Sequence, residues 1–445
     1  MNVIMILIDA LRADHLSLNG YKRKTSPNID EIANENVFFC NGITAIPSTT
    51  PSIASIMTGL YPHSHGLRFV HRQKLNSKIT TLPEILQAHN YRTIGYDLGS
   101  IGDGLEKGFD AFSLLSWRIL NKIKRIITKS INWNRRIEEA EEVTVFAKKQ
   151  IKKHKGEKFF LYLNYPDLHW PYKPPKPFCE MFDPDYKGEH LFNDWDNKIE
   201  RGDMIFNNTL PKEEIYHAIA HYDGTIRFID IQIGQIIKYL EEIKLIDKTL
   251  ILITADHGES LGEHNLYFQH TLSLYDEGIR VPLIISSPTI KQPKKIETQV
   301  QSTDIMPTIL EILGIPLIEN IDGKSLVPLI KGEKFDRKYS FAENGELLFQ
   351  QNNRSFFRGI KGKWRMIRTN EWKLIYIPHP ENDIFELYNL KKDPKETINL
   401  IGKEPEIAKE LKEELFKWMN SSKEDKDIDL TEKSKKILKN LGYIE

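Results

Sequence analysis

Apolar runs of strand length alternate with amphipathic helical patterns along most of the chain. The runs are apolar almost throughout, which is typical of parallel strands buried on both faces of a sheet. This alternation predicts an α/β fold, a three-layer α/β/α sandwich around a mostly parallel central sheet. The predicted strands are Val3–Ile8, Thr93–Tyr96, Phe159–Asn164, Thr249–Thr254 and Pro282–Ser286, and the predicted helices are Leu82–His89, Arg136–His154, Glu213–Glu242 and a helix that Asp304 caps and Gly314 ends.

The pattern changes after residue 335. Short strand-like segments at Arg365–Arg368, Trp372–Ile377 and Phe385–Tyr388 are separated by polar turns, which predicts a small antiparallel sheet. Pro405–Asn420 has the spacing of an amphipathic helix. We therefore predict a main domain over residues 1–335, an antiparallel sheet subdomain over 336–402 and a helical tail over 403–445.

Composition and charge narrow the class of protein. The 445 residues carry 62 basic and 62 acidic side chains, and this balance argues against a nucleic-acid binder held by bulk charge. Two cysteines exclude a disulfide scaffold, and we expect Cys40 in a buried strand. No apolar run approaches the ~20 residues of a transmembrane helix. The apolar N-terminus lacks a basic leader region, so we expect a cytoplasmic protein, although a chain that has lost an export signal would look the same.

Three candidate ligand groups follow predicted strands. Asp9 comes directly after the first strand, Asp256 and His257 follow Thr249–Thr254, and His169 lies just beyond Phe159–Asn164. In an open α/β sheet, binding sites form at the carboxyl ends of the strands, so these residues should converge. Asp and His are suitable ligands for a divalent metal ion. A single Asp in such a place would be a helix cap or a turn, but three equivalent placements favour a site.

A cluster of hydroxyl side chains, Ser48, Thr49 and Thr50, precedes a predicted helix start at Ser52. A hydroxyl at a helix N-terminus beside a metal ion can ionise and act as a nucleophile. A plain helix cap is the alternative, and composition alone favours the cap.

Taken together and in order, these segments resemble the sulfatase family of the alkaline phosphatase superfamily. The resemblance runs from residue 2 to about residue 400 and rests on Asn2–Leu16, Thr25–Asp30, Thr49–Gly66, His169–Tyr172, Thr254–His264, Tyr275–Glu277, Arg280–Leu283, Asp322–Leu326, Trp372–Tyr376 and Glu386–Leu390. It implies an alkaline phosphatase-like catalytic domain followed by a small C-terminal sheet.

The resemblance also implies roles for individual residues. One divalent metal ion would be held by Asp9, Asp256 and His257, with Thr49 as a further contact. His169 would donate a hydrogen bond to the ester or to the leaving oxygen, and His270 is the next candidate as general acid. Because His257 supplies nitrogen, Mn²⁺ or Zn²⁺ is favoured, while Ca²⁺ and Mg²⁺ stay open. Members of a second metal set would be His65, His264 and His270, but we expect one ion.

The departures from the family shape the functional prediction. The residue that sulfatases convert to formylglycine falls on Thr49, and the arginine of that motif falls on Ile53, so no formylglycine is expected. Ala10 replaces an Asp, Gln269 replaces a Lys, and Thr93–Asp97 lacks the family's Lys. We expect a phosphodiester or phosphonate ester hydrolase, or a related transferase, with Thr49 as nucleophile. A sulfate ester hydrolase without formylglycine and a non-catalytic metal-binding protein are the alternatives.

Three features remain open. Residues 117–136 form a basic amphipathic pattern that would suit an anionic membrane surface, although a solvated basic face is favoured. Residues 99–134 and 173–212 would select a small-molecule or glycan ester. Tyr222 and Asp223, within a predicted helix, are expected to be packing and capping groups. The oligomeric state is not predicted.

Overall fold

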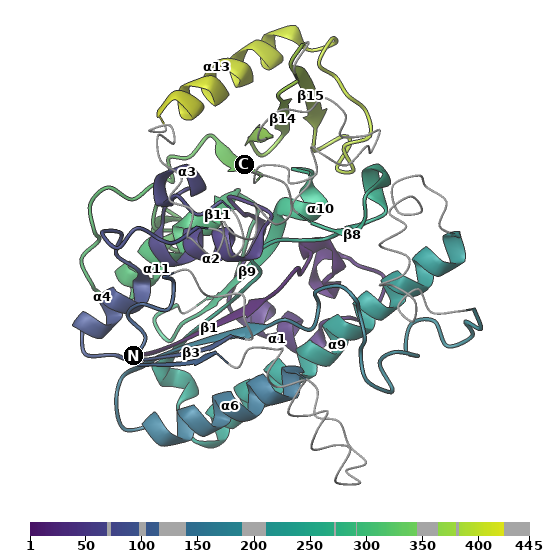
Figure 1. Cartoon of the computed structure of the whole chain (residues 1–445). Coiled ribbons are helices and arrows are strands. Elements are labelled where there is room, and N and C mark those ends of the chain that lie inside the picture. Colours follow the sequence, from purple (N-terminus) through teal and green to yellow (C-terminus); the bar gives the residue numbers. More distant parts are fainter. Residues whose placement is uncertain are drawn as a thin grey trace, which may run out of the picture.

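A twisted sheet occupies the middle of the molecule (Figure 1). The computed structural model describes residues 1–68, 73–97, 104–114, 139–188, 211–270, 273–290, 292–344, 364–379 and 382–421. Within those residues the strand order is β10 (Lys294–Ile296), β2 (Val37–Ile43), β9 (Arg280–Ser286), β6 (Thr249–Thr254), β1 (Asn2–Ile8), β5 (Phe159–Tyr165), β3 (Arg92–Asp97) and β4 (Ala111–Leu114), and β11 (Val300–Gln301) pairs with β2.

The sheet is mostly parallel, as the alternation of strands and helices predicts. Of the described pairings, only those of β9 with β2 and with β6 are antiparallel. All seven residues of β1 are buried. Ile4, Ile6 and Ile8 enter one hydrophobic core, whereas Val3, Met5 and Leu7 enter the other. The two-residue period of a strand therefore places apolar side chains on both faces, which explains the uniformly apolar run.

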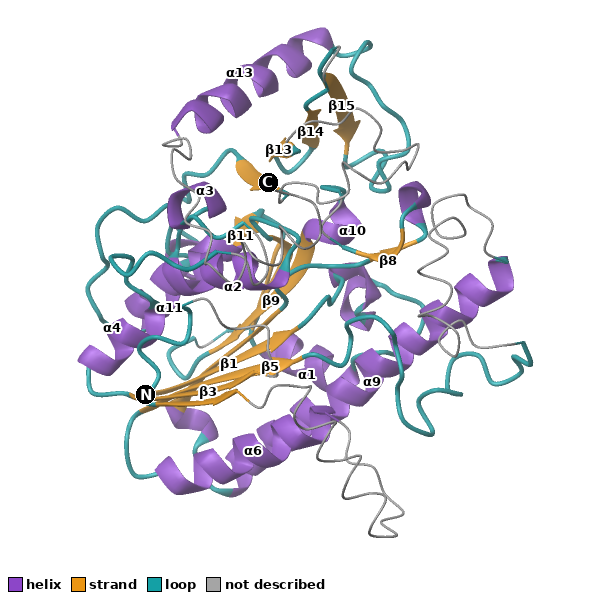
Figure 2. Ribbon diagram, in the orientation of Figure 1, coloured by secondary structure: helices purple, strands orange, loops and turns teal. Residues whose placement is uncertain are grey.

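Helices cover each face of the sheet and complete the three layers (Figure 2). One face is covered by α1 (Pro27–Glu35), α6 (Glu139–His154) and α9 (Lys212–Glu242). The other is covered by α2 (Thr49–Thr58), α4 (Leu82–Ala88) and α11 (Ile305–Ile312). The bounds of α4, α6, α9 and α11 confirm the predicted helices, except that residues 136–138 lie outside the described part of the chain. The sequence did not predict α1, and α2 begins at Thr49, before the predicted start at Ser52.

A second sheet follows, antiparallel as predicted, in the order β12 (Ser340–Glu343), β13 (Arg365–Arg368), β14 (Trp372–Ile377) and β15 (Ile384–Asn389). One face packs against α13 (Pro405–Ser421), where Leu374 contacts the cluster that contains Leu411 and Leu415. The other face packs against α10 (Asp276–Ile279) of the main domain. The sheet is therefore held between its own helix and the main domain.

Asp304 occupies the N-cap position of α11, as predicted, but its side chain makes no capping hydrogen bond there. A 3-10 turn, Ser302–Asp304, leads directly into α11, so the helix begins without a side-chain cap. The Asp304 carboxylate instead accepts hydrogen bonds from the backbone N–H groups of Gln301 and Lys324 and from Arg337. Gly314, at φ +68°, ends the helix as predicted.

The pattern analysis did not predict the short elements. Cys40 lies in the buried strand β2, as expected. Several other elements of the structure were not predicted from the sequence. They are the helix α1, the strands β4, β10, β11 and β12, the hairpin strands β7 (Ser260–Leu261) and β8 (Tyr267–Gln269), the short helices α3 (Pro62–His65), α10 and α12 (Val327–Lys331), and the 3-10 helices Ala13–His15, Ser17–Asn19, Ile246–Lys248, Glu263–Asn265 and Ser302–Asp304.

Candidate active site

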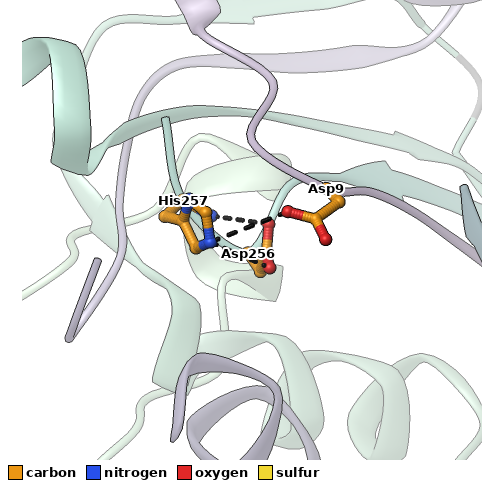
Figure 3. Close-up of side chains that lie close together, drawn as sticks. All are labelled: Asp9, Asp256 and His257. Atoms are coloured by element: carbon orange, nitrogen blue, oxygen red, sulfur yellow. Dashed lines mark hydrogen bonds and ion pairs between the residues drawn. The ribbon is translucent and has the colours of Figure 1, made fainter. Parts of the chain in front are cut away.

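Two adjacent strands deliver the predicted metal ligands to one place. β1 and β6 run parallel in register, with Leu7 opposite Thr254, so the residues that follow them emerge at the same edge. Asp9, Asp256 and His257 each offer a ligand atom, and all three atoms lie within 4.8 Å of one another. Figure 3 shows these side chains pointing toward a common centre. Within the described residues, this is the one group of three or more acidic, His or Cys side chains so arranged.

The tautomer of His257 is fixed by its surroundings. Nδ1 lies 2.8 Å from the Gly258 carbonyl oxygen and can only donate to it, which leaves Nε2 unprotonated and able to accept. Nε2 lies 3.3 Å from Asp256 Oδ2 and 3.7 Å from Asp9 Oδ1. Burial lowers the pKa of His257 to about 3, so the ring is neutral at neutral pH and its nitrogen is available to a metal ion.

The two carboxylates need a cation. Asp9 is 3% exposed and Asp256 is fully buried, and Asp9 Oδ1 and Asp256 Oδ2 have no hydrogen-bond partner among the described residues. Burial and the neighbouring Asp256 raise the pKa of Asp9 well above its ordinary value. Such a pair of buried anionic groups is unfavourable unless a positive charge lies between them. The donor set of two carboxylates and one imidazole therefore fits a divalent metal ion.

Thr49 lies beside the same cluster. It is the first residue of the ten-residue helix α2, and its Oγ1 is 3.2 Å from His257 Nε2. The side chain is buried, with 7% exposed. The Ser52 hydroxyl, one turn on, donates to the Asp256 carbonyl oxygen at 2.7 Å and so ties the helix to the end of β6. The N-terminus of α2 thus directs its positive end toward the site.

The predicted histidines lie beside the candidate metal ligands: His270 stacks on His257 and meets His169 edge to face. The ring centroids of His270 and His257 are 4.1 Å apart, and those of His270 and His169 are 5.1 Å apart. Burial, together with His169, lowers the pKa of His270 to about 3. His169 is exposed, and its Nδ1 lies 2.8 Å from the Trp170 carbonyl oxygen. The structure therefore brings together all six predicted site residues: Asp9, Thr49, His169, Asp256, His257 and His270.

The geometry agrees with the family comparisons. A model of the sulfatase family matches residues 1–315, more than half of the chain. The chain belongs to the sulfatase family. A model described as the C-terminal part of N-sulphoglucosamine sulphohydrolase matches residues 262–423. Family membership supports an ester hydrolase, of a family that is generally metal-dependent.

Individual relatives extend over nearly the whole sulfatase chain. Human "Arylsulfatase K" is 26% identical over 95% of this chain and 83% of its own length. A structure in complex with its substrate D-glucosamine-2-N,6-O-disulfate is 24% identical, covers 96% of this chain and 99% of that chain, and has a TM-score of 0.78. The phosphonate monoester hydrolase of Agrobacterium radiobacter is 21% identical over 95% and 96% of the two chains, with a TM-score of 0.76. At these identities the structural likenesses establish the fold alone.

Two acidic residues of this candidate site were not predicted. Glu259 is fully buried, and its Oε1 is 3.4 Å from His270 Nδ1. The hairpin β7–β8 makes this contact, because Gln269 pairs with Ser260 and so returns the chain to Glu259. Burial raises the pKa of Glu259 to about 8. Asp97, the last residue of β3, is fully buried, accepts a hydrogen bond from Asn164 at 2.8 Å and acts electrostatically on Asp9. Asp97 directly follows the predicted strand Thr93–Tyr96, and this position could have identified it as a site residue.

Of the other predicted residues, some lie apart from the candidate metal ligands and some lie outside the described part of the chain. The rings of His264 and Tyr275 stack at 3.6 Å, and His65 Nε2 lies 3.0 Å from Ser55 Oγ, so neither His joins the metal ligands. Residues 117–136 and much of 99–134 and 173–212 lie outside the described residues. None of the described helices is long and apolar enough to cross a membrane.

Proposed function

We propose that this sulfatase-family protein is a metal-dependent hydrolase of phosphodiesters or phosphonate monoesters, or a related transferase, with Thr49 as its nucleophile. The observation that carries the proposal is the 3.2 Å separation of Thr49 Oγ1 from His257 Nε2, beside two buried carboxylates. A helix cap is the alternative role for Thr49, but the N-cap residue of α2 is Ser48, whose side chain makes no capping hydrogen bond, and Thr49 is the first residue of the helix itself.

The metal ion would be held by Asp9, Asp256 and His257, with the Thr49 oxygen as a fourth ligand. When bound, a divalent ion withdraws charge from the ester oxygen and lowers the pKa of the adjacent hydroxyl. The mixed oxygen and nitrogen donors favour Mn²⁺ or Zn²⁺.

The protein's own residues would carry out the two chemical steps. Thr49 Oγ1 loses its proton to solvent and forms a bond to phosphorus, while the bond from phosphorus to the leaving oxygen breaks. The leaving oxygen takes a proton from His270, whose pKa rises when an anionic ester lies against it, and His169 donates a hydrogen bond to the same group. Water, or an acceptor alcohol in a transferase, then attacks phosphorus and gives up its proton to His270, which lost one in the first step. The bond from phosphorus to Thr49 Oγ1 breaks, and this oxygen regains a proton from solvent.

The identity of the residues around the nucleophile supports this choice of ester. Ile53 and Gln269 occupy positions where the family carries cations, and threonine does not supply the aldehyde hydrate of formylglycine. A site with few cations favours an ester that carries a single negative charge, which describes both a phosphodiester and a sulfate monoester. The absence of a formylglycine precursor at residue 49 is what favours phosphorus.

A sulfate ester hydrolase is the second candidate, because the relatives argue for it. Human Arylsulfatase K and the glucosamine disulfate complex both carry sulfate chemistry in their descriptions. In that case Thr49 would attack sulfur, and the substrate would be a small-molecule or glycan sulfate. A non-catalytic metal-binding protein is the third candidate.

A substrate panel with matched variants tests these candidates. Metal-stripped protein reloaded with Mn²⁺ or Zn²⁺ would be assayed on p-nitrophenyl sulfate, p-nitrophenyl phosphate, bis-p-nitrophenyl phosphate and p-nitrophenyl phenylphosphonate. Thr49→Ala should lower kcat on the preferred ester by on the order of 10³-fold or more, because it removes the nucleophile. Thr49→Ser should retain much of the activity. The control is Thr58→Ala, a buried threonine at the other end of α2 whose hydroxyl donates to the Ala54 carbonyl oxygen.

The outcomes separate the three candidates. Cleavage of the diester or phosphonate that needs both metal and Thr49 supports the proposal. Dominant sulfate cleavage would replace it by the second candidate. Metal binding without any turnover dependent on Thr49 would leave the non-catalytic protein.

A further inference from the structure

The turn that follows β1 holds Asp9 through an unusual backbone conformation. Ala10 has φ +57°, in the left-handed region that favours glycine. The Asp9 N–H still donates to the Tyr165 carbonyl oxygen at 3.0 Å, as part of the sheet edge. The chain therefore leaves the sheet and turns within one residue, so the direction of the Asp9 carboxylate depends on what keeps Ala10 in this conformation.

Distant residues bind both backbone groups of Ala10. Its N–H donates to Asp256 Oδ1 at 3.1 Å. Its carbonyl oxygen accepts a hydrogen bond from the Tyr222 hydroxyl at 2.7 Å, and the same hydroxyl oxygen accepts the Arg12 N–H at 3.0 Å. One phenol thus bridges the turn as donor and acceptor at once, which phenylalanine could not do.

The Tyr222 ring is itself fixed. Tyr222 belongs to α9 and is fully buried. Its ring meets the rings of His15 and Tyr172 edge to face, each at a centroid distance of 5.1 Å. The hydroxyl therefore cannot move away from the turn without disturbing the core on this face of the sheet.

We infer that Tyr222 is a positioning residue for the metal centre: its hydroxyl holds the Asp9–Arg12 turn in the conformation that directs Asp9 toward Asp256 and His257. The inference rests on the proposed function, since it concerns the metal ion of that site. It assigns to Tyr222 a role beyond the packing expected from the sequence. Without the hydroxyl, Ala10 can relax out of the left-handed region, and both the Asp9 carboxylate and the N–H bound by Asp256 would shift.

The test compares full-length Tyr222→Phe with wild type, using Mn²⁺ as the probe. We expect the calorimetric Kd for Mn²⁺ to rise about 10- to 100-fold, as for other groups that orient metal ligands. The KM for the preferred ester should stay within about twofold, and saturating Mn²⁺ should restore most of kcat, because the hydroxyl acts through the metal ligands alone. A hydroxyl that only stabilised the fold would, when removed, lower the melting temperature and leave the Kd for Mn²⁺ unchanged.

Tyr165→Phe is the matched control. Tyr165 is also fully buried, and its hydroxyl lies 3.1 Å from Thr144 Oγ1 of α6. Its bond to the Asp9 N–H uses the backbone carbonyl oxygen, which phenylalanine keeps. It should lose a similar amount of thermal stability while its Kd for Mn²⁺ stays unchanged. The double variant Tyr222→Phe/Ala10→Gly adds a rescue, because glycine adopts the left-handed conformation without the hydroxyl. We expect it to bind Mn²⁺ at least about threefold more tightly than Tyr222→Phe.

Several results would overturn the inference. If wild type binds Mn²⁺ and Tyr222→Phe binds it equally well, Tyr222 does not position the site. If Tyr222→Phe does not fold, the double variant carries the comparison, and failure of both to fold would assign the hydroxyl to the fold alone. If wild type binds neither Mn²⁺ nor Zn²⁺, the proposed function itself is wrong, whatever the variants do.

Discussion

At the scale of the residue, the side chains that would bind a metal ion destabilise the metal-free protein. Asp9 and Asp256 are buried, and each has a carboxylate oxygen with no hydrogen-bond partner in the described part of the chain. Burial and the nearby Asp256 raise the pKa of Asp9. Folding therefore favours the protonated form of Asp9, and the stability that this group contributes is present below its ordinary pKa of ~3.9 and is lost as the pH rises through the raised value.

Asp9→Asn should therefore stabilise the metal-free protein while it weakens metal binding. Near pH 8 we expect a melting temperature about 2 °C higher than that of metal-free wild type, which corresponds to ~1 kcal/mol in a large domain. Added Mn²⁺ should raise the melting temperature of wild type but not of the variant. Asp247→Asn, at an exposed position, is the control and should change neither quantity. A metal-free Asp9→Asn protein less stable than wild type would contradict this account of the cluster.

At the scale of the element, close backbone contact sets where the loop after β6 lies. Gly258 N–H donates to the Gly278 carbonyl oxygen, and Glu259 N–H donates to that of Glu277, so the loop runs along α10. A Cβ atom on Gly258 would lie 2.0 Å from the Glu277 carbonyl oxygen. Glycine is therefore required by the approach of two backbones, directly beside the ligand His257.

Gly258→Ala should push the loop away from α10 and displace His257. We expect a loss of about 1–3 kcal/mol in the free energy of unfolding, as for other overpacked sites. The affinity for Mn²⁺ should fall about tenfold, because the ligand geometry is disturbed. Chemical denaturation and calorimetry would measure the two effects. Gly402→Ala, where an added Cβ would meet no atom within 4 Å, should leave both unchanged, and an equal loss in the two variants would disprove the steric argument.

At the scale of the whole molecule, a buried ion network joins the C-terminal sheet to the main domain. Lys373 of β14 is fully buried, and its Nζ lies 2.9 Å from Asp276 of α10 and 2.7 Å from Glu396. Arg368 also pairs with Asp276, at 3.1 Å. Although burial opposes its ionisation, Arg368 and Lys373 hold the pKa of Asp276 well below its usual range. Burial raises the pKa of Glu396 to about 7 even beside Lys373.

Lys373→Met should therefore weaken the attachment of the C-terminal sheet to the main domain. Removing the cation leaves two acidic groups buried together, and we expect a loss of about 3 kcal/mol near pH 8. The loss should shrink toward pH 5, because an acid whose folded-state pKa is raised stabilises the fold when protonated. Urea denaturation at the two pH values measures this. Lys391→Met, which breaks an exposed pair with Glu371, should leave the free energy of unfolding nearly unchanged at either pH, because solvent screens that pair. A pH-independent loss in Lys373→Met would refute the electrostatic explanation.

Hydrophobic patterning predicted the fold better than it predicted the small elements. β1, β5 and β6 are buried on both faces, so nearly all of their residues are apolar. Such strands can be recognised from their own sequence, whatever lies beside them. β12 and β10 are only three or four residues long, and they become strands because a partner strand lies beside them. Asp304 shows the same limit, since a preceding turn rather than its side chain starts α11.

The sequence by itself determined which residues would meet at the ligand cluster. Asp9, Asp256 and His257 follow strands whose carboxyl ends must gather at one edge of a parallel sheet, so local pattern was sufficient. Only the tertiary structure decided how Thr49 lies against His257 and that Glu259 lies beside His270. The Tyr222 hydroxyl reaches Ala10 across 212 positions of sequence. Contacts of that kind depend on a helix packing against a left-handed turn, and no periodicity along the chain encodes that packing.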